Sequence, residues 1–160
     1  MELPRRKGAP SGDGRTLILA SASPRRRQLL DQLGRPFEVA PADVDETEPP
    51  GMAPQAVAET LAERKARVIA RERSEGLVLG ADTIVTDGAR TYGKPRDRGH
   101  AIEILSRLSS RPHWVITGVC LIDARTGRTK TASDRTQVTM RAMSREEIEA
   151  YVDSGEAMGK

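Results

Sequence analysis

Short apolar runs and longer stretches of helical periodicity alternate along the chain from residue 16 onwards. Runs such as TLILA and WVITGVCLI are typical of strands, whereas apolar positions spaced three and four apart are typical of helices. The order of these elements predicts an α/β fold in which a mixed central sheet is flanked by helices. The predicted strands are 16–20, 37–40, 77–79, 84–85, 114–122 and 129–140, and the predicted helices are 24–33, 54–73, 97–108 and 144–152.

Capping and turn residues set several of these boundaries. Ser23 is a good N-cap, and Pro24 suits the first helical position because its missing N–H is not needed there. Ser144 with Glu147 predicts a capping box at the last helix. Asp87-Gly88 is a hairpin signal. Within the first two helices, apolar faces are predicted from Leu29, Leu30 and Leu33, and from Val57, Leu61 and Ile69.

The chain divides into a short tail and one domain. Residues 1–15 are rich in Pro, Gly and charge without apolar periodicity, so we expect a flexible basic tail. Residues 16–160 form the expected domain, with an acidic, Pro-rich loop at 41–53.

Composition narrows the function classes. About a third of the 160 residues are charged, the net charge is +3, and aromatic residues are scarce, which disfavours stacking on nucleic acid. The single cysteine, Cys120, excludes an internal disulfide and reads as a buried small hydrophobe. No run is apolar enough for a signal peptide or membrane helix, so we expect a cytoplasmic protein without membrane association.

The turn at 21–27, SASPRRR, is the strongest chemical signal. A strand leads into it and a helix starts from it, and helix N-termini attract anions. Arg25 and Arg26 are unfavourable at this positive end unless a polyanion offsets them, so Ser21, Ser23 and the arginines are candidate phosphate ligands. A capped helix with solvated arginines explains the same residues equally well.

Carboxylates provide two further signals. Asp82 follows an apolar strand, where open α/β sheets place ligands, and could hold a divalent metal or act as a general base. A lone Asp also often satisfies loop amides. The acidic loop could supply oxygen ligands to Mg²⁺, although such loops are commonly just solvated; its acids are Asp43, Asp45, Glu46 and Glu48.

Other candidates are weaker when taken singly. Lys65 lies in the middle of a helix, where lysine usually serves solubility. Lys94, between Gly93 and Pro95, is a better phosphate candidate because its turn is restricted. His113 reads as a strand-edge residue. No Walker loop, GxGxxG, HExxH or Cys/His metal spacing is present.

Taken together, these segments resemble the Maf family of nucleotide pyrophosphatases, once described as septum-formation proteins. The resemblance runs in register over 16–160, through LILASASPRRRQLLDQLG, VDE, LAERKA, LVLGADTIV, YGKPRD, LSSRPHWVITGV and SGEAMGK. It implies a Maf/inosine triphosphatase-like fold. It also implies hydrolysis between the α- and β-phosphates of nucleoside triphosphates, with Mg²⁺ or Mn²⁺ as cofactor.

The resemblance also implies residue roles. Asp82 would be the proton acceptor, and Glu46 would help Asp82 to place metal or water. Arg25, Arg26, Lys65 and Lys94 would grip phosphates. Arg25 and Thr83 resemble the branch that acts on dTTP and UTP, rather than the one that acts on 7-methyl-GTP.

Two further expectations follow from the family. The family pattern continues past Lys160 into a closing segment, so we expect a C-terminally truncated Maf domain. A homodimer is expected by analogy.

Two other functions stay open. One is a non-catalytic nucleotide-binding regulator of cell division or septum formation. The other, a nucleic-acid-binding domain suggested by the arginine content, is disfavoured by near-balanced charge, so we expect no nucleic-acid partner.

Overall fold

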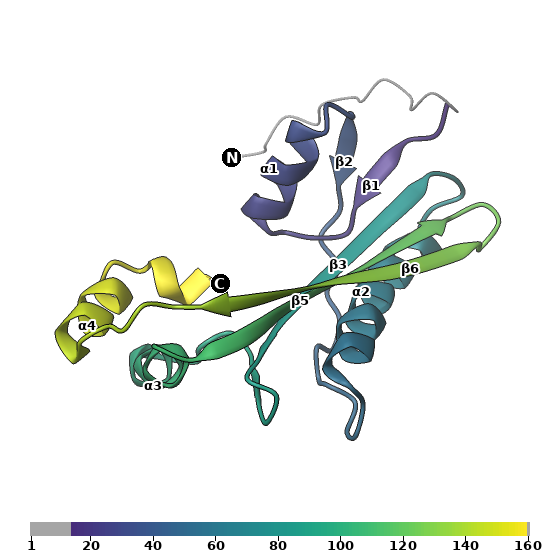
Figure 1. The fold of residues 1–160 in the computed structure, drawn as a ribbon. Helices are drawn as coiled ribbons and strands as arrows, with labels where there is room; N and C mark the ends of the chain where they lie inside the picture. The colour runs from purple at the N-terminus through teal and green to yellow at the C-terminus, as the bar shows by residue number, and fades with distance from the viewer. Residues whose placement is uncertain (1–13, 160) are drawn as a thin grey trace. The chain divides into compact units, whose positions relative to one another are not determined.

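The computed structural model describes residues 14–159, which form a mixed sheet and four α-helices (Figure 1). The sheet order is β2-β1-β3-β5-β6, with β4 paired to β3. β1 is parallel to β2 and β3, whereas β4 is antiparallel to β3, so the predicted α/β class with a mixed sheet is confirmed. The elements are β1 (Leu17–Leu19), α1 (Pro24–Gln32), β2 (Phe37–Val39), α2 (Pro54–Arg71), β3 (Leu77–Thr86), β4 (Thr91–Tyr92), α3 (Arg98–Leu108), β5 (Pro112–Asp123), β6 (Thr129–Thr139), α4 (Arg145–Asp153) and the 3₁₀ turn η1 (Glu156–Gly159).

The local signals for helix starts are confirmed. Ser23 caps α1 with Pro24 in its first turn, and Ser144 forms a reciprocal capping box with Glu147 at α4. The Asp87-Gly88 signal is confirmed by the hairpin between β3 and β4. The expected tail lies outside the described residues, apart from Gly14 and Arg15.

One strand prediction was wrong in detail. The segments 77–79 and 84–85 belong to one strand, β3, because residues 80–83 stay in the sheet instead of forming a break. His113 is the second residue of β5 and is 4% exposed, and its Nδ1 lies 3.2 Å from the Arg111 carbonyl oxygen.

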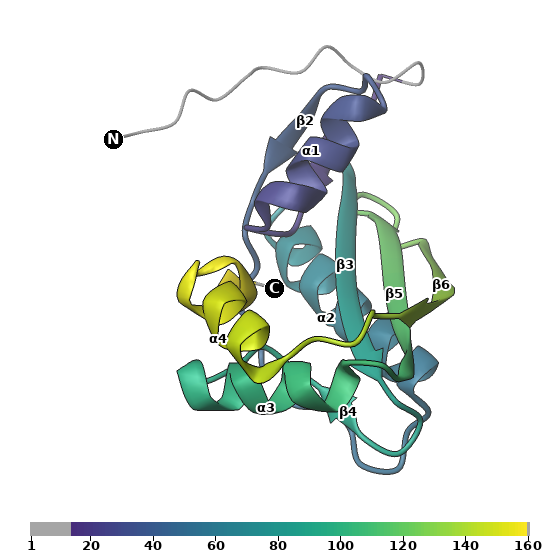
Figure 2. The same cartoon turned by 60° about the vertical axis from the view of Figure 1, so that its left-hand side comes forward.

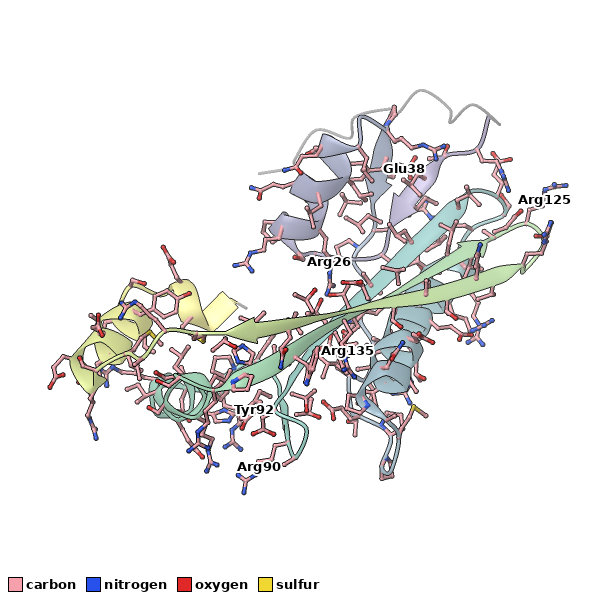
Figure 3. The ribbon with its side chains drawn as sticks, in the orientation of Figure 1. Arg26, Glu38, Arg90, Tyr92, Arg125 and Arg135 are labelled. Carbon is pink, nitrogen blue, oxygen red and sulfur yellow. The ribbon has the colours of Figure 1, made fainter. Side chains whose placement is uncertain are left out.

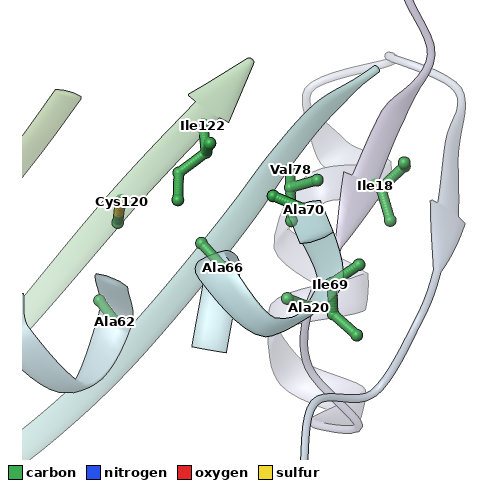
Figure 4. Close-up of a cluster of buried hydrophobic side chains, with 9 residues drawn as sticks. All are labelled: Ile18, Ala20, Ala62, Ala66, Ile69, Ala70, Val78, Cys120 and Ile122. Carbon is green, nitrogen blue, oxygen red and sulfur yellow. The ribbon is translucent and has the colours of Figure 1, made fainter. Parts of the chain in front are cut away.

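One face of the sheet packs against α2 (Figure 4). Strand residues of alternating positions meet small residues of the helix, and the cluster consists of Ile18, Ala20, Ala62, Ala66, Ile69, Ala70, Val78, Cys120 and Ile122. Alternate strand residues point to opposite faces, so the neighbours Leu17 and Leu19 point away from α2.

The opposite face is covered by α1 through Leu30, which packs with Leu17 and Leu19. The predicted apolar face of Leu29, Leu30 and Leu33 was wrong in part. Only Leu30 is buried, while Leu29 is 60% and Leu33 71% exposed. Leu30 is thus the one buried residue of the nine in α1.

Two glycines bring α2 unusually close to the sheet. A Cβ on Gly80 of β3 would lie 2.1 Å from the Ala62 carbonyl oxygen, and one on Gly118 of β5 would lie 2.4 Å from that of Ala58. Neither distance is compatible with a side chain. The close approach between helix and sheet therefore depends on glycine at both positions.

The chain divides into two compact units, of which the first is 1–82 with 117–134 and the second is 83–116 with 135–160. In the second unit α3 and α4 pack side by side (Figure 2) around Ala101, Val152 and Ala157. Arg98 of α3 makes a two-pronged ion pair with Asp153 of α4, at 2.7 and 3.0 Å. None of the helices in the stretch 14–159 is long and apolar enough to cross a membrane.

Replacing Gly80 with alanine should destabilise the protein by about 3 kcal/mol, because overpacking forces the helix away from the strand. Urea unfolding measures the loss. Gly93→Ala is the matched control, since its Cβ would meet nothing within 4 Å, and it should change stability by less than about 0.5 kcal/mol. Equal effects of the two substitutions would contradict the close approach.

Cys120 should resist thiol reagents in the folded protein. Its side chain is fully buried, and burial raises its pKa to about 11, so the thiol stays protonated at neutral and mildly alkaline pH. Labelling with a chromogenic disulfide at pH 8 should be slow in buffer and immediate in urea. Rapid labelling of the folded protein would show that this strand is not packed as described.

Candidate active site

The turn after β1 is organised around the hydroxyl of Ser21. This side chain is buried, and its Oγ accepts hydrogen bonds from the Ser23 backbone N–H and from an Arg26 guanidinium nitrogen, both at 3.2 Å. The Ser23 Oγ in turn accepts from the Arg26 backbone N–H at 3.5 Å. The sequence SASPRR thus folds back so that one arginine is held against the strand end.

Arg26 lies at the start of α1 (Figure 3), where α1 has no acidic residue in its first turn. Burial lowers the pKa of its guanidinium, and the nearby carboxylates of Asp82 and Glu46 act in the opposite direction. Arg26 is therefore near enough to Asp82 and Glu46 for their charges to act on it. Arg26 lies at the positive end of α1, and the negative charges that offset this arrangement come from residues outside that helix.

The register of the sheet explains why the turn and Asp82 are close. β1 and β3 run in parallel with Leu19 beside Leu79, and the Ala20 backbone N–H donates to the Leu79 carbonyl at 2.8 Å. Continuing both strands brings Ser21 alongside the segment that holds Asp82. Asp82 itself lies inside β3 rather than after its end, and is 8% exposed.

The centre of the site is Lys65, whose ammonium lies between two carboxylates. Its Nζ is 2.6 Å from Asp82 Oδ1 and 2.7 Å from Glu46 Oε1. The Lys65 and Asp82 side chains are 9% and 12% exposed, while that of Glu46 is 52% exposed. Lys65 and Asp82 form a largely buried charge pair, and Glu46 joins it from the solvent side.

Helix packing places Lys65 there. Gly80 and Asp82 are two residues apart and therefore point to the same face of β3, the face against which α2 lies. Because Gly80 lets α2 approach so closely, the lysine one turn along from Ala62 reaches the carboxylate directly. The signal for this was present in the sequence, since Lys65 continues the stripe that Leu61 and Ile69 define on the buried face of α2.

The acidic loop is tied to α2 through its backbone. The Arg64 guanidinium donates to the carbonyl oxygens of Asp45 and Thr47, at 3.3 and 3.1 Å. The Asp45 carboxylate accepts a hydrogen bond from the Thr47 N–H at 2.9 Å, and hydrogen bonding by the Thr47 side chain and backbone lowers the pKa of Asp45. Of the loop acids, Glu46 is thus the one that contacts Lys65.

Three other predicted site residues lie at exposed positions. Arg25 is exposed on α1, and Thr83 is exposed on the next position of β3. Lys94 is exposed on the connection between β4 and α3, in the second unit. Their predicted roles stay predictions.

A cavity of about 460 Å³ lies beside the acidic loop and includes Asp43 and Asp45, but not Glu46, Lys65 or Asp82. It is lined by Asp43, Val44, Asp45, Arg64, Arg67, Val68 and Arg71. The cluster around Lys65 is defined by its contacts rather than by this cavity.

The carboxylates of Asp82 and Glu46 fit a hard divalent cation. Both already bind the same positive group, and carboxylate oxygens are the ligands that Mg²⁺ and Mn²⁺ favour. Within residues 14–159 no group of three or more His, Cys, Asp and Glu side chains could hold a metal. A cation here would therefore complete its shell with water or substrate oxygens, as Mg²⁺ commonly does.

The chain belongs to the Maf family: residues 16–160 match the family described as "Maf-like protein". A dTTP/UTP pyrophosphatase of Desulforamulus reducens is 47% identical over 146 residues, covering 91% of this chain and 76% of the relative. One of Pelotomaculum thermopropionicum is 44% identical over 144 residues, covering 90% and 75%. The membership expected from the sequence is confirmed.

The fold has a counterpart among solved structures. A structure of a HAM1 protein from Coxiella burnetii superposes with a TM-score of 0.53 at 17% sequence identity, covering 77% of this chain and 71% of that one. At 17% sequence identity this similarity shows a related fold and carries no information about the chemistry of the site.

Mutual dependence of Lys65 and Asp82 is testable by a double-mutant cycle. Lys65→Met and Asp82→Asn should each destabilise by about 3 kcal/mol, because each removes one half of the buried pair and leaves the other charge less well compensated. The double variant should lose about 2 kcal/mol less than the sum of the two.

Urea unfolding of the four proteins gives the coupling energy. The exposed pair of Glu103 and Arg107 on α3, at 3.0 Å, is the control and should couple by about 0.5 kcal/mol or less. Additive effects at Lys65 and Asp82 would mean that the two side chains do not interact in solution.

Proposed function

We propose that this chain hydrolyses dTTP and UTP, and related modified pyrimidine nucleotides, to the monophosphate and pyrophosphate. The observation that carries the proposal is the cluster of Asp82, Glu46 and Lys65 beside the basic turn at Arg26. Its support from outside the structure is the name dTTP/UTP pyrophosphatase, which curated relatives more than 40% identical carry.

In this proposal one residue accepts a proton and the basic residues stabilise negative charge. Water attacks the α-phosphorus, Asp82 accepts the proton that the water loses, and the bond from the α-phosphorus to the bridging oxygen breaks as pyrophosphate leaves. In the cation-free protein Asp82 Oδ1 accepts a hydrogen bond from Lys65, at 2.6 Å.

Positive groups would stabilise the charge that develops on the leaving pyrophosphate. Arg26 is already held by Ser21 with its guanidinium near the carboxylates, so little reorganisation is needed. Arg25 and Lys94 would add further phosphate contacts, since arginine grips phosphate in two-pronged fashion. Ser23 supports the turn through the helix cap.

A divalent cation, Mg²⁺ or Mn²⁺, would be held by Asp82 and Glu46. When bound, it would polarise a phosphoryl oxygen and neutralise negative charge. We assign the preference for dTTP and UTP to Arg25 and Thr83. We also propose that the protein is a cytoplasmic homodimer and that it does not bind nucleic acid.

The alternative, a regulator that binds nucleotide without hydrolysing it, gains no support from these observations. Binding alone does not call for a largely buried carboxylate in contact with a lysine, as Asp82 is with Lys65. Pyrophosphate release separates the two functions directly.

Asp82→Asn should lower pyrophosphate release from dTTP and UTP by at least about 100-fold, because the amide cannot accept the proton. Nucleotide binding, followed by calorimetry, should persist. Asp31→Asn is the control, since Asp31 is an exposed acid of α1 outside the site, and its turnover should match that of the wild type.

Undiminished turnover by Asp82→Asn would remove Asp82 as the base. Turnover of 7-methyl-GTP with dTTP and UTP left intact would contradict the substrate class. Nucleotide binding without any pyrophosphate release by the wild type, across triphosphates and metals, would favour the regulator.

A further inference from the structure

The Lys65 ammonium contacts the two carboxylates, those of Asp82 and Glu46, that would hold a divalent cation. Its distances to the two carboxylate oxygens, 2.6 and 2.7 Å, put both oxygens in contact with one positive centre. An ammonium and a hydrated divalent ion seek the same oxygen ligands, and they cannot occupy the same position. Lys65 and the cation therefore compete for the same oxygens.

The charges of the cluster show what Lys65 does when no cation is bound. Asp82 and Glu46 carry two negative charges close together, and a buried charge without a partner is strongly unfavourable. Lys65 offsets one of them by direct contact, and Arg26 acts on both from the turn. Two positive groups thus offset the two negative charges within the site.

The three side chains of the cluster differ in how far their positions are fixed, and Lys65 has the most flexible side chain. Asp82 is fixed within β3, whereas Glu46 is on a loop and half-exposed. Lysine has a flexible stem of four carbons with a compact head, and the stem of Lys65 lies in the buried stripe of α2. Rotation about the bonds of that stem is the movement that would separate the ammonium from both oxygens.

We propose that Lys65 is a stand-in for the divalent cation: it holds Asp82 and Glu46 together in the cation-free protein and gives up both oxygens when the cation enters. The freed ammonium is then available to the phosphates of the substrate, and this last step alone rests on the proposed function. Entry of the cation and release of Lys65 are one exchange. Phosphate gripping by Lys65 would then follow from cation binding.

The test is the affinity of the nucleotide-free protein for Mn²⁺, measured by calorimetry after treatment with EDTA. In the Lys65→Met variant no ammonium has to be displaced, so Mn²⁺ should bind about tenfold more tightly than in the wild type. Lys65→Arg keeps the charge and should show no gain. Adding Asp82→Asn to Lys65→Met should abolish the gain.

Arg71→Met is the matched control. It removes one positive charge from the same helix at an exposed position in the last turn, and it should change the affinity for Mn²⁺ by less than about twofold. A similar gain in both variants would mean that the effect is one of general charge, and the exchange would be wrong. Unchanged or weaker binding by Lys65→Met would overturn it as well.

Thermal unfolding keeps the test decisive if Lys65→Met folds poorly. Two unpaired carboxylates destabilise the cation-free variant, so saturating Mn²⁺ should raise its Tm more than that of the wild type. An equal or smaller rise would contradict the exchange.

Hydrolysis of dTTP by the wild type, assayed on the same preparation, separates the two proposals. If dTTP is hydrolysed but Lys65→Met gains no affinity for Mn²⁺, the exchange alone is wrong. If the gain is observed and no nucleotide is hydrolysed, the exchange stands and the proposed function fails.

Discussion

The contact between the Lys65 ammonium and the Asp82 carboxylate is the interaction on which the site depends. It brings a charged helix residue into a face that is otherwise lined with alanine, leucine and isoleucine. Such burial is tolerable only because the opposite charge is 2.6 Å away, and that distance requires Gly80 to let α2 lie against β3. One glycine, one lysine and one aspartate therefore link the packing of the core to the chemistry of the site.

Much of the fold followed from the sequence because its signals are local. Caps such as Ser23 and Ser144 act over three residues, and apolar periodicity is decided within each helix. The errors arose where contacts with residues distant in the sequence determine the structure. A strand was expected to break at Gly80, yet Gly80 faces α2 and the strand continues through it. Leu29 and Leu33 have the right spacing for a buried face, but only Leu30 meets the sheet.

The site shows the same division. Ser21 and Arg26 were identified as candidates from the turn alone, since a strand, a cap and a basic helix start are adjacent in sequence. Lys65 was a weak candidate site residue when taken alone, because a lysine in the middle of a helix is usually solvated. Its place in the buried stripe of α2 was readable, but its partners are 17 and 19 positions away and depend on the approach of helix and strand. The predicted roles of Arg25, Thr83 and Lys94 depend on a ligand, which side-chain contacts within the chain do not reveal.

The most direct test of this account is to observe the Lys65 ammonium itself by NMR on protein labelled with ¹⁵N-lysine, without nucleotide or metal. Solvated lysine ammonium groups exchange their protons with water too quickly to be detected at neutral pH, whereas a buried ammonium bonded to two carboxylates should exchange slowly. The account predicts one slowly exchanging Nζ signal at pH 7 that disappears in Lys65→Met and exchanges faster in Asp82→Asn. Rapid exchange of every lysine ammonium in the folded protein would contradict it.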